Sequence, residues 1–199
     1  MKIVGLCGGS GSGKSTAAEM FRAYGLPVVD ADALYHELTD APSDCVRQIA
    51  AAFGNEVVTP TGALNRPVLA KRIFSDPTGE ARKKLNRITH GQVLALAKSR
   101  MSRYEKEGAP VVIFDVPLLF ESGFDRMCDR TVCVVADPQA RLRRIIARDG
   151  VDETMARARM AAQIPDEELM RRCDLCIRND GTTEELAQAV KECLSHILA

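Results

Sequence analysis

Short runs of apolar residues alternate along this chain with longer stretches in which apolar residues recur at helical spacing. The apolar runs are continuous rather than alternating with polar residues, which is typical of strands buried on both faces of a parallel sheet. The runs predicted to be strands are KIVGLC (2–7), PVVD (27–30), PVVIFD (110–115), RTVCVV (130–135) and DLCI (174–177). The helical stretches between most of them indicate crossover connections. The pattern therefore predicts an α/β fold built on a five-stranded parallel sheet.

Residues 31–109 depart from this alternation of strands and helices, because they contain several helical segments and no convincing core strand. The interval is too long for a single crossover, so we expect a mostly helical insertion beside the sheet. The plainer alternative is a set of extra packing helices without a function. At 199 residues, the chain fits one domain, 1–199, that carries this insertion as a subdomain at 31–109.

Composition narrows the classes of protein that the chain can belong to. The 27 basic and 27 acidic residues balance, which disfavours sequence-independent binding of nucleic acid. No apolar stretch approaches the roughly 18 residues that a membrane span needs, and the first residues show no signal-peptide pattern. We expect a soluble, cytoplasmic protein without a nucleic-acid or membrane partner, and no obligate protein partner is evident.

Seven cysteines raise the question of a metal site. Cys173 and Cys176 have the C-x-x-C spacing, but a structural zinc site would need a second close pair. Cys128 and Cys133 are the available candidates, and Cys133 lies in a strand-like run, where it is interpreted as a small buried hydrophobe. An odd number of cysteines also argues against a disulfide framework. We expect neither zinc nor disulfides.

The most specific motif is GLCGGSGSGKST at 5–16, which matches G-x-x-x-x-G-K-[ST] between a strand and a helix. A turn of this kind leaves backbone N–H groups unpaired, and a polyphosphate can approach them because side chains are absent. The dinucleotide pattern G-x-G-x-x-G fails, since its last glycine would fall on Lys14 or Thr16. The motif predicts a nucleoside triphosphate site, with Lys14 on the β and γ phosphates and the Ser15 hydroxyl on Mg²⁺. The predicted contacts are Gly8, Gly9, Ser10, Gly11, Ser12, Gly13, Lys14, Ser15 and Thr16.

Three uses of the triphosphate compete: phosphoryl transfer to a small molecule, a guanine-nucleotide switch, and an ATPase coupled to other work. A switch would carry an N-K-x-D motif, which is absent, and the D-x-x-G match at 76–79 lies in a helical region and is interpreted as chance. A small-molecule kinase needs an acceptor pocket and a mobile cover that excludes water. The insertion at 31–109 suits the pocket, and the arginine-rich segment 141–172 suits a lid.

Charged residues near the predicted sheet edge complete the candidate site. Arg141, Arg144 and Arg148 share one face of a predicted helix, where a solvated surface is the alternative to phosphate contact. Asp30 and Asp32 follow the second strand, at the edge where parallel sheets bind ligands. We interpret Asp30 as a helix N-cap and Asp32 as the base that accepts the proton of an acceptor hydroxyl. Asp115 ends the third strand, where a carboxylate would hold Mg²⁺ or its waters.

These segments together resemble the dephospho-coenzyme A kinase family over nearly the whole chain. The resemblance is carried by GLCGGSGSGKST, PVVDADALYHEL, GALNRPVLAKRIFSDP, LNRITH and DVPLLFESG, and by RDG, AAQ and CDLCIRNDG in the last third. It implies a three-layer P-loop NTPase fold and ATP-dependent phosphorylation of the ribose 3′-hydroxyl of dephospho-coenzyme A. It further implies Asp32 as the general base, Arg66 and His90 as substrate-binding residues, and Arg144 and Arg148 as lid arginines that act on the transferring group.

This chain departs from the family pattern at several positions. Cys7 replaces the usual Thr, Ser10 the usual Ile, and Gly91 the usual Pro after His90, which is expected to loosen a turn there. The segment Cys-Asp-Leu-Cys at 173–176 replaces Ala-Asp-Asp-Val. Two alternatives to the implied function remain open: a kinase of another hydroxyl compound or of a nucleoside monophosphate, and a nucleotide-dependent regulatory switch.

Overall fold

The protein is described by a computed structural model that covers residues 1–198. The chain forms two compact units, which we describe separately: unit 1 comprises Met1–Val29 and Arg103–Ala199, and unit 2 comprises Asp30–Ser102. The chain passes from one unit to the other within strand β2 (Val28–Asp30) and within helix α5 (Glu80–Lys106).

A five-stranded sheet with strand order β2-β3-β1-β4-β5 forms the framework of unit 1. Its other strands are β1 (Lys2–Gly8), β3 (Val111–Asp115), β4 (Arg130–Val135) and β5 (Leu175–Arg178). Strand β1 pairs in parallel with β3 and β4, and β4 pairs in parallel with β5. The predicted α/β fold with a parallel sheet is confirmed, and each predicted strand lies within a residue or two of its expected bounds.

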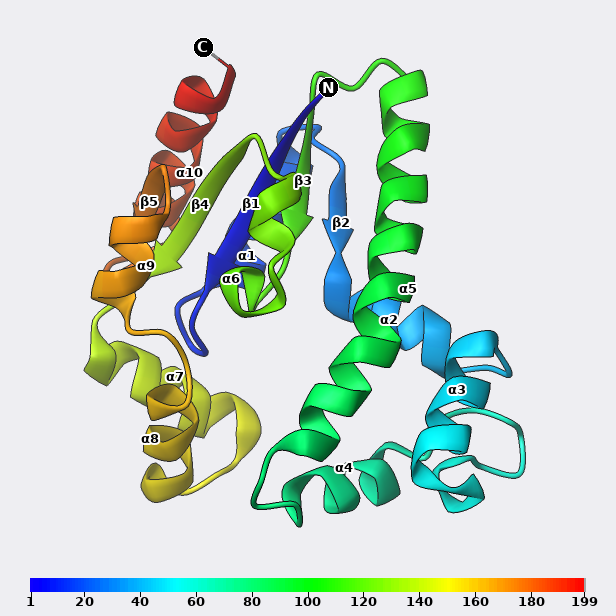
Figure 1. Ribbon diagram of the computed structural model, residues 1–199. Coiled ribbons are helices and arrows are strands. Elements are labelled where there is room, and N and C mark those ends of the chain that lie inside the picture. Colours follow the sequence, from blue (N-terminus) through cyan, green and yellow to red (C-terminus); the bar gives the residue numbers. More distant parts are fainter. Residues whose placement is uncertain (199) are drawn as a thin grey trace. The chain divides into compact units, whose positions relative to one another are not determined.

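Helices α1 (Lys14–Ala23) and α10 (Thr183–Leu198) cover one face of the sheet (Figure 1). Their apolar stripes pack on alternate residues of the strands, such as Leu6 and Val132, and this cluster is the main core. The opposite face is covered by the short helices α6 (Leu119–Ser122) and α9 (Asp166–Arg172), which contact β1 and β4. Burial on both faces explains why the strands are continuous apolar runs.

The remaining elements of unit 1 lie in the connections before and after β4. The 3₁₀ helix η2 (Phe124–Met127) precedes β4, and α7 (Pro138–Asp149) and α8 (Glu153–Ala161) follow it. Helix α7 begins where the Asp137 carboxylate accepts hydrogen bonds from the backbone N–H groups of Gln139 and Ala140. With α9, these helices contain the arginine-rich segment 141–172.

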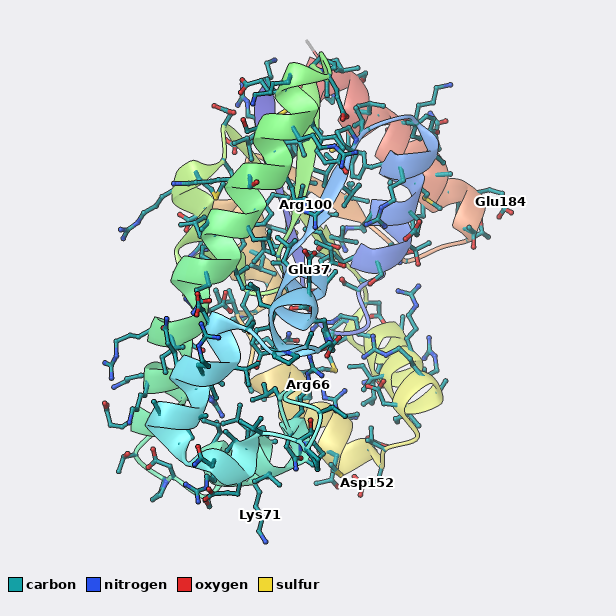
Figure 2. The ribbon with its side chains drawn as sticks, turned by 90° about the vertical axis from the view of Figure 1, so that its right-hand side faces the viewer. Glu37, Arg66, Lys71, Arg100, Asp152 and Glu184 are labelled. Carbon is teal, nitrogen blue, oxygen red and sulfur yellow. The ribbon has the colours of Figure 1, made fainter. Side chains whose placement is uncertain are left out.

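Unit 2 is helical, with α2 (Ala31–Thr39), α3 (Asp44–Phe53), η1 (Asn55–Val57), α4 (Arg66–Phe74) and most of α5. Its own apolar core is formed around Ile49, Val57 and Leu69. An ion pair between Glu37 and Arg100, 2.7 Å long, joins α2 to α5 (Figure 2). In the part of the chain that the structure describes, no helix is long and apolar enough to cross a membrane.

Candidate active site

The glycine-rich segment forms the connection between β1 and α1. Gly11 and Gly13 have φ angles of 77° and 94°, in the left-handed region that side chains disfavour. At Gly13, a Cβ atom would also lie 2.0 Å from Nδ2 of Asn179, so only glycine fits there. The helix begins at Lys14 without a side-chain cap. Its first N–H groups are therefore available to an anion, as the motif predicts.

Contacts from distant parts of unit 1 hold the loop in place. Asn179, buried just after β5, donates a 2.8 Å hydrogen bond from Nδ2 to the carbonyl of Ser12. Within the loop, the Ser12 N–H donates to the carbonyl of Gly9 at 3.1 Å. A loop fixed in this way keeps its N–H groups oriented before a ligand binds, which reduces the entropy lost on binding.

Lys14 and Asp115 meet in this structure, although they are 101 residues apart in the sequence. The Nζ atom of Lys14 donates to Oδ1 of Asp115, and the carboxylate is almost completely buried. Because β1 and β3 pair in register, Leu6 lies opposite Asp115, and the end of β3 falls beside the start of the loop. Ser15, the next residue of α1, is exposed.

The arginines of α7 occupy three different environments. Arg144 donates from one terminal nitrogen to the Gly11 carbonyl (3.2 Å) and from the other to the Asn179 carbonyl (3.1 Å). Arg148 lies in the last turn, is largely exposed and pairs with Asp149, which raises the pKa of the guanidinium. The structure thus places Arg144 against the glycine-rich loop and directs Arg148 to a carboxylate outside it.

Arg141 is buried and connects the loop to α9. Its Nε donates to the Ser10 carbonyl at 3.0 Å, and Nη1 pairs with Oδ1 of Asp166 at 2.5 Å. The segment before α9 also contacts the loop, because the Ser10 N–H donates to Oε1 of Gln163 at 2.8 Å. Both backbone polar groups of Ser10, its N–H and its carbonyl, are therefore held by residues of the segment 141–172.

In unit 2, Asp30 caps α2, as the sequence predicts. Its Oδ1 accepts hydrogen bonds from the N–H groups of Asp32 (2.8 Å) and Ala33 (3.1 Å). Asp32 lies in the first turn of the same helix and has an exposed side chain. The cap thereby fixes the backbone that presents the Asp32 carboxylate.

Arg66 is held at the start of α4 by residues from the end of α2. Its terminal nitrogens contact Oδ1 of Asp40 and Oγ1 of Thr39, each at 2.7 Å, and its guanidinium lies 6.0 Å from the ring centre of Tyr35. The Nε atom is buried without a hydrogen-bond partner among residues 1–198. The guanidinium of Arg66 is thus anchored through its terminal nitrogens, while its Nε donor has no protein partner among residues 1–198.

His90 lies in the middle of α5 and is half-buried, and burial lowers the pKa of its imidazole. The expected turn after it is wrong: helix α5 runs without interruption from Glu80 to Lys106 through Gly91. Glycine has a low helix propensity but no steric obstacle to helical geometry, and the long helix tolerates it here. Gly91 therefore leaves the helix continuous past His90.

Several residues with a structural role in the site were not singled out by sequence reasoning. Asn179, Gln163 and Asp166 hold the loop and Arg141, and Asp40 and Thr39 hold Arg66. Their partners are distant in sequence, so local spacing carries no signal for them. The resemblance to a known family covers the segments that contain Gln163 and Asn179, and this would have been the available signal.

Among residues 1–198, no group of three or more His, Cys, Asp or Glu side chains is arranged to hold an ion. All seven cysteines are free thiols.

A parallel sheet whose central strand leads into a G-x-x-x-x-G-K-S loop, with a buried carboxylate beside the lysine and arginines packed on the loop, defines a P-loop kinase. The family model described as "Dephospho-CoA kinase" matches residues 2–185. The chain belongs to the dephospho-CoA kinase family.

Individual relatives agree with this assignment. The chain is 43% identical to the dephospho-CoA kinase of Syntrophotalea carbinolica over 198 residues, which are 100% of this chain and 93% of the relative. Among solved structures, it is similar to TT1252 from Thermus thermophilus, with 37% identity and a TM-score of 0.84 over 98% of this chain and 97% of the other. It is also similar to a dephospho-CoA kinase from Campylobacter jejuni, with 25% identity and a TM-score of 0.73 over 99% of this chain and 98% of the other.

Proposed function

We propose that this chain transfers the γ-phosphoryl group of ATP to the 3′-hydroxyl of the ribose of dephospho-coenzyme A, the last step of coenzyme A synthesis. The observation that carries the proposal is the match to the dephospho-CoA kinase family across residues 2–185, combined with a preformed phosphate-binding loop.

On the nucleotide side, N–H groups within residues 8–16 bind the phosphates at the amino end of α1, where the helix dipole favours anions. Lys14 exchanges its present partner, Asp115, for the β and γ phosphates. Arg144, close to the Gly11 carbonyl, and Arg148, further along α7, stabilise the negative charge that develops on the transferring group. The Gln163 side chain leaves the Ser10 N–H when a phosphate oxygen takes this donor.

Mg²⁺ fits the donor set beside Lys14. Ser15 contributes a hydroxyl and Asp115 a buried carboxylate, both of which are hard oxygen ligands of the kind that Mg²⁺ prefers. When bound, the ion neutralises charge on the phosphate oxygens. The remaining positions would be filled by phosphate oxygens and water, as is usual for this ion.

On the acceptor side, Asp32 accepts the proton of the 3′-hydroxyl as the phosphoryl group is transferred. An exposed carboxylate in the first turn of a capped helix has a fixed backbone and access to a ligand. Arg66 is positioned by Asp40 and Thr39, and its partnerless Nε atom is a donor that a substrate oxygen can use. His90, which burial keeps neutral at pH 7, contributes to the same substrate-binding unit.

The proposal is tested by a coupled assay of ADP release with a panel of acceptors: dephospho-coenzyme A, nucleoside monophosphates, shikimate and no acceptor. We expect turnover with dephospho-coenzyme A alone, and loss of this turnover when EDTA removes Mg²⁺. Equal or faster turnover of a nucleoside monophosphate would assign the chain to a different acceptor. Slow hydrolysis that no acceptor accelerates would indicate a regulatory switch.

A further inference from the structure

Three cysteines form a row across the sheet of unit 1. In the parallel register, Cys7 of β1 lies opposite Cys133 of β4, and Cys133 lies opposite Cys176 of β5. Register partners in adjacent parallel strands direct their side chains to the same face. The neighbouring row, with Leu6 and Val132, faces the core under α1 and α10, so the cysteines lie on the face covered by α9.

A fourth cysteine joins this row from outside the sheet. Cys173 follows the last residue of α9, and its Sγ lies 3.7 Å from Sγ of Cys7. Cys133, which lies between Cys7 and Cys176 in the row, donates its thiol to the Leu175 carbonyl at 3.7 Å. Cys7 and Cys133 are buried, Cys173 is half-buried and Cys176 is exposed. The cluster therefore extends from the surface to the residue that directly precedes Gly8.

The Cys7–Cys173 contact is close to the geometry of a disulfide. A disulfide has an S–S length of about 2.05 Å, so the sulfur atoms need to approach by less than about 2 Å. Cys7 lies in the central strand, whereas Cys173 lies in the short connection between α9 and β5. Among the residues that the structure describes, no metal-binding arrangement competes for these thiols.

The environments of the two thiols give them different chemical roles. The neighbouring thiols of Cys133 and Cys7 stabilise the Cys173 thiolate and lower the pKa of that residue. The hydrogen bond with Cys173 and burial raise the pKa of Cys7. Cys173 is thus the better nucleophile, and it is also the more accessible of the two.

We propose that Cys7 and Cys173 form a reversible disulfide, which is made by exchange with a low-molecular-weight disulfide and restrains α9 against the strand that leads into the phosphate-binding loop. In the first step, the Cys173 thiolate attacks one sulfur of the small disulfide and releases one small thiolate. In the second step, the sulfur of Cys7 attacks Cys173 and releases the second. The two protein thiols lose two electrons and two protons, and the small disulfide takes up both to become two thiols.

The expected consequence follows from the contacts of the segment before Cys173. Gln163 accepts a hydrogen bond from the Ser10 N–H of the loop. Arg141, which pairs with Asp166, donates to the Ser10 carbonyl. A covalent bond between Cys7 and Cys173 ties the far end of α9 to the base of the same loop. Because lid opening and product release limit the rate of many kinases, we expect the disulfide to slow turnover by about tenfold.

The pairing is tested by peptide mapping of the full-length protein after incubation with oxidised glutathione. The proposal predicts loss of two thiols and a peptide in which Cys7 is linked to Cys173. A Cys173–Cys176 or Cys133–Cys176 link, glutathione attached to Cys176 alone, or an unchanged thiol count would overturn it. This measurement needs no kinase substrate, so its failure is distinct from failure of the proposed function.

The effect on turnover is tested with the same oxidised protein and with variants. We expect dithiothreitol to restore full turnover, and we expect Cys7→Thr and Cys173→Ala to be as active as the parent protein and insensitive to oxidised glutathione. The matched control, Cys176→Ser, should stay sensitive. An oxidised parent protein of undiminished turnover, or a slowed Cys173→Ala variant, would contradict the switch.

Discussion

Asp30 and Asp32 lie two positions apart at the start of one helix and differ in their contacts. Asp30 uses its carboxylate to cap the helix, whereas the side chain of Asp32 is exposed in the first turn. A cap is replaceable by another cap, because asparagine accepts the same hydrogen bonds. A general base is not, because asparagine cannot accept a proton. The same substitution by asparagine therefore distinguishes the structural role of Asp30 from the chemical role proposed for Asp32.

Replacement of Asp32 by Asn should lower kcat by about 100- to 10,000-fold, the usual contribution of a general base, while the Kd for ATP changes little. Asp30→Asn is the matched control, since it retains a cap, and it should keep most of the activity. Steady-state kinetics and isothermal titration with ATP measure both quantities. Near-normal turnover of Asp32→Asn would remove this residue from the mechanism.

Gly91 offers a test of the uninterrupted α5 helix. It is exposed and lies in the helix interior, and a Cβ there would meet no atom within 4 Å apart from the adjacent backbone of the same helix. Gly91→Ala should therefore raise the free energy of unfolding by roughly 0.5–1 kcal/mol. Gly108→Ala, at a φ angle of 84°, should lower it, because alanine disfavours that conformation. Urea unfolding measures the free energy of unfolding of both variants. A Gly91→Ala variant that is less stable than the parent would indicate that the helix is broken at this point.

At the scale of elements, α7 shows what a helical period can and cannot predict. The period places Arg141, Arg144 and Arg148 on one face, but the partners of Arg141 and Arg144 come from other parts of unit 1. Arg141 meets Asp166, Arg144 meets the glycine-rich loop, and Arg148 meets its neighbour Asp149. Spacing thus identifies a charged face. The burial of one arginine and the exposure of another depend on long-range packing and could not be predicted from it.

The buried Arg141–Asp166 ion pair should be costly to break. The two side chains are 6% and 13% exposed, so removal of the carboxylate leaves a buried guanidinium with one partner fewer. Asp166→Ala should lower the free energy of unfolding by about 3 kcal/mol. Arg148→Ala, at an exposed pair, should change it by less than about 1 kcal/mol. Thermal or urea unfolding measures the loss of stability in both variants. Equal losses would contradict the different burial of the two ion pairs.

The D-x-x-G match at 76–79 proves to be a turn that leads into α5. The Asp76 carboxylate accepts hydrogen bonds from the Ala81 N–H and from Thr78, and these lower the pKa of its side chain. A lowered pKa gives stability that is present above the unfolded-state value of about 3.9 and is lost as pH falls through the folded-state value. Asp76→Ala should therefore be less stable than the parent at pH 7, and the difference should shrink below pH 4. A difference that is independent of pH would show that charge is not involved.

At the scale of the whole molecule, local patterns predicted the strands and the class of fold, because buried parallel strands and a P-loop have strong local signatures. The strand order, with β1 between β3 and β4, could not be predicted from these local patterns and is known only from the structure. Asn179 and Ser12 are in contact but lie 167 residues apart in the sequence, so the spacing of nearby residues could not predict this contact. The cysteine row depends on strand register in the same way, so the cysteines could be counted but not paired.

The central proposal is that this P-loop kinase phosphorylates one specific hydroxyl, the 3′-hydroxyl of the ribose of dephospho-coenzyme A. The most direct measurement is NMR spectroscopy of the product that the purified protein forms from Mg·ATP and dephospho-coenzyme A. We predict a new phosphomonoester whose phosphorus couples to the 3′ proton of the ribose. A phosphate at any other position, or no product at all, would contradict the central claim.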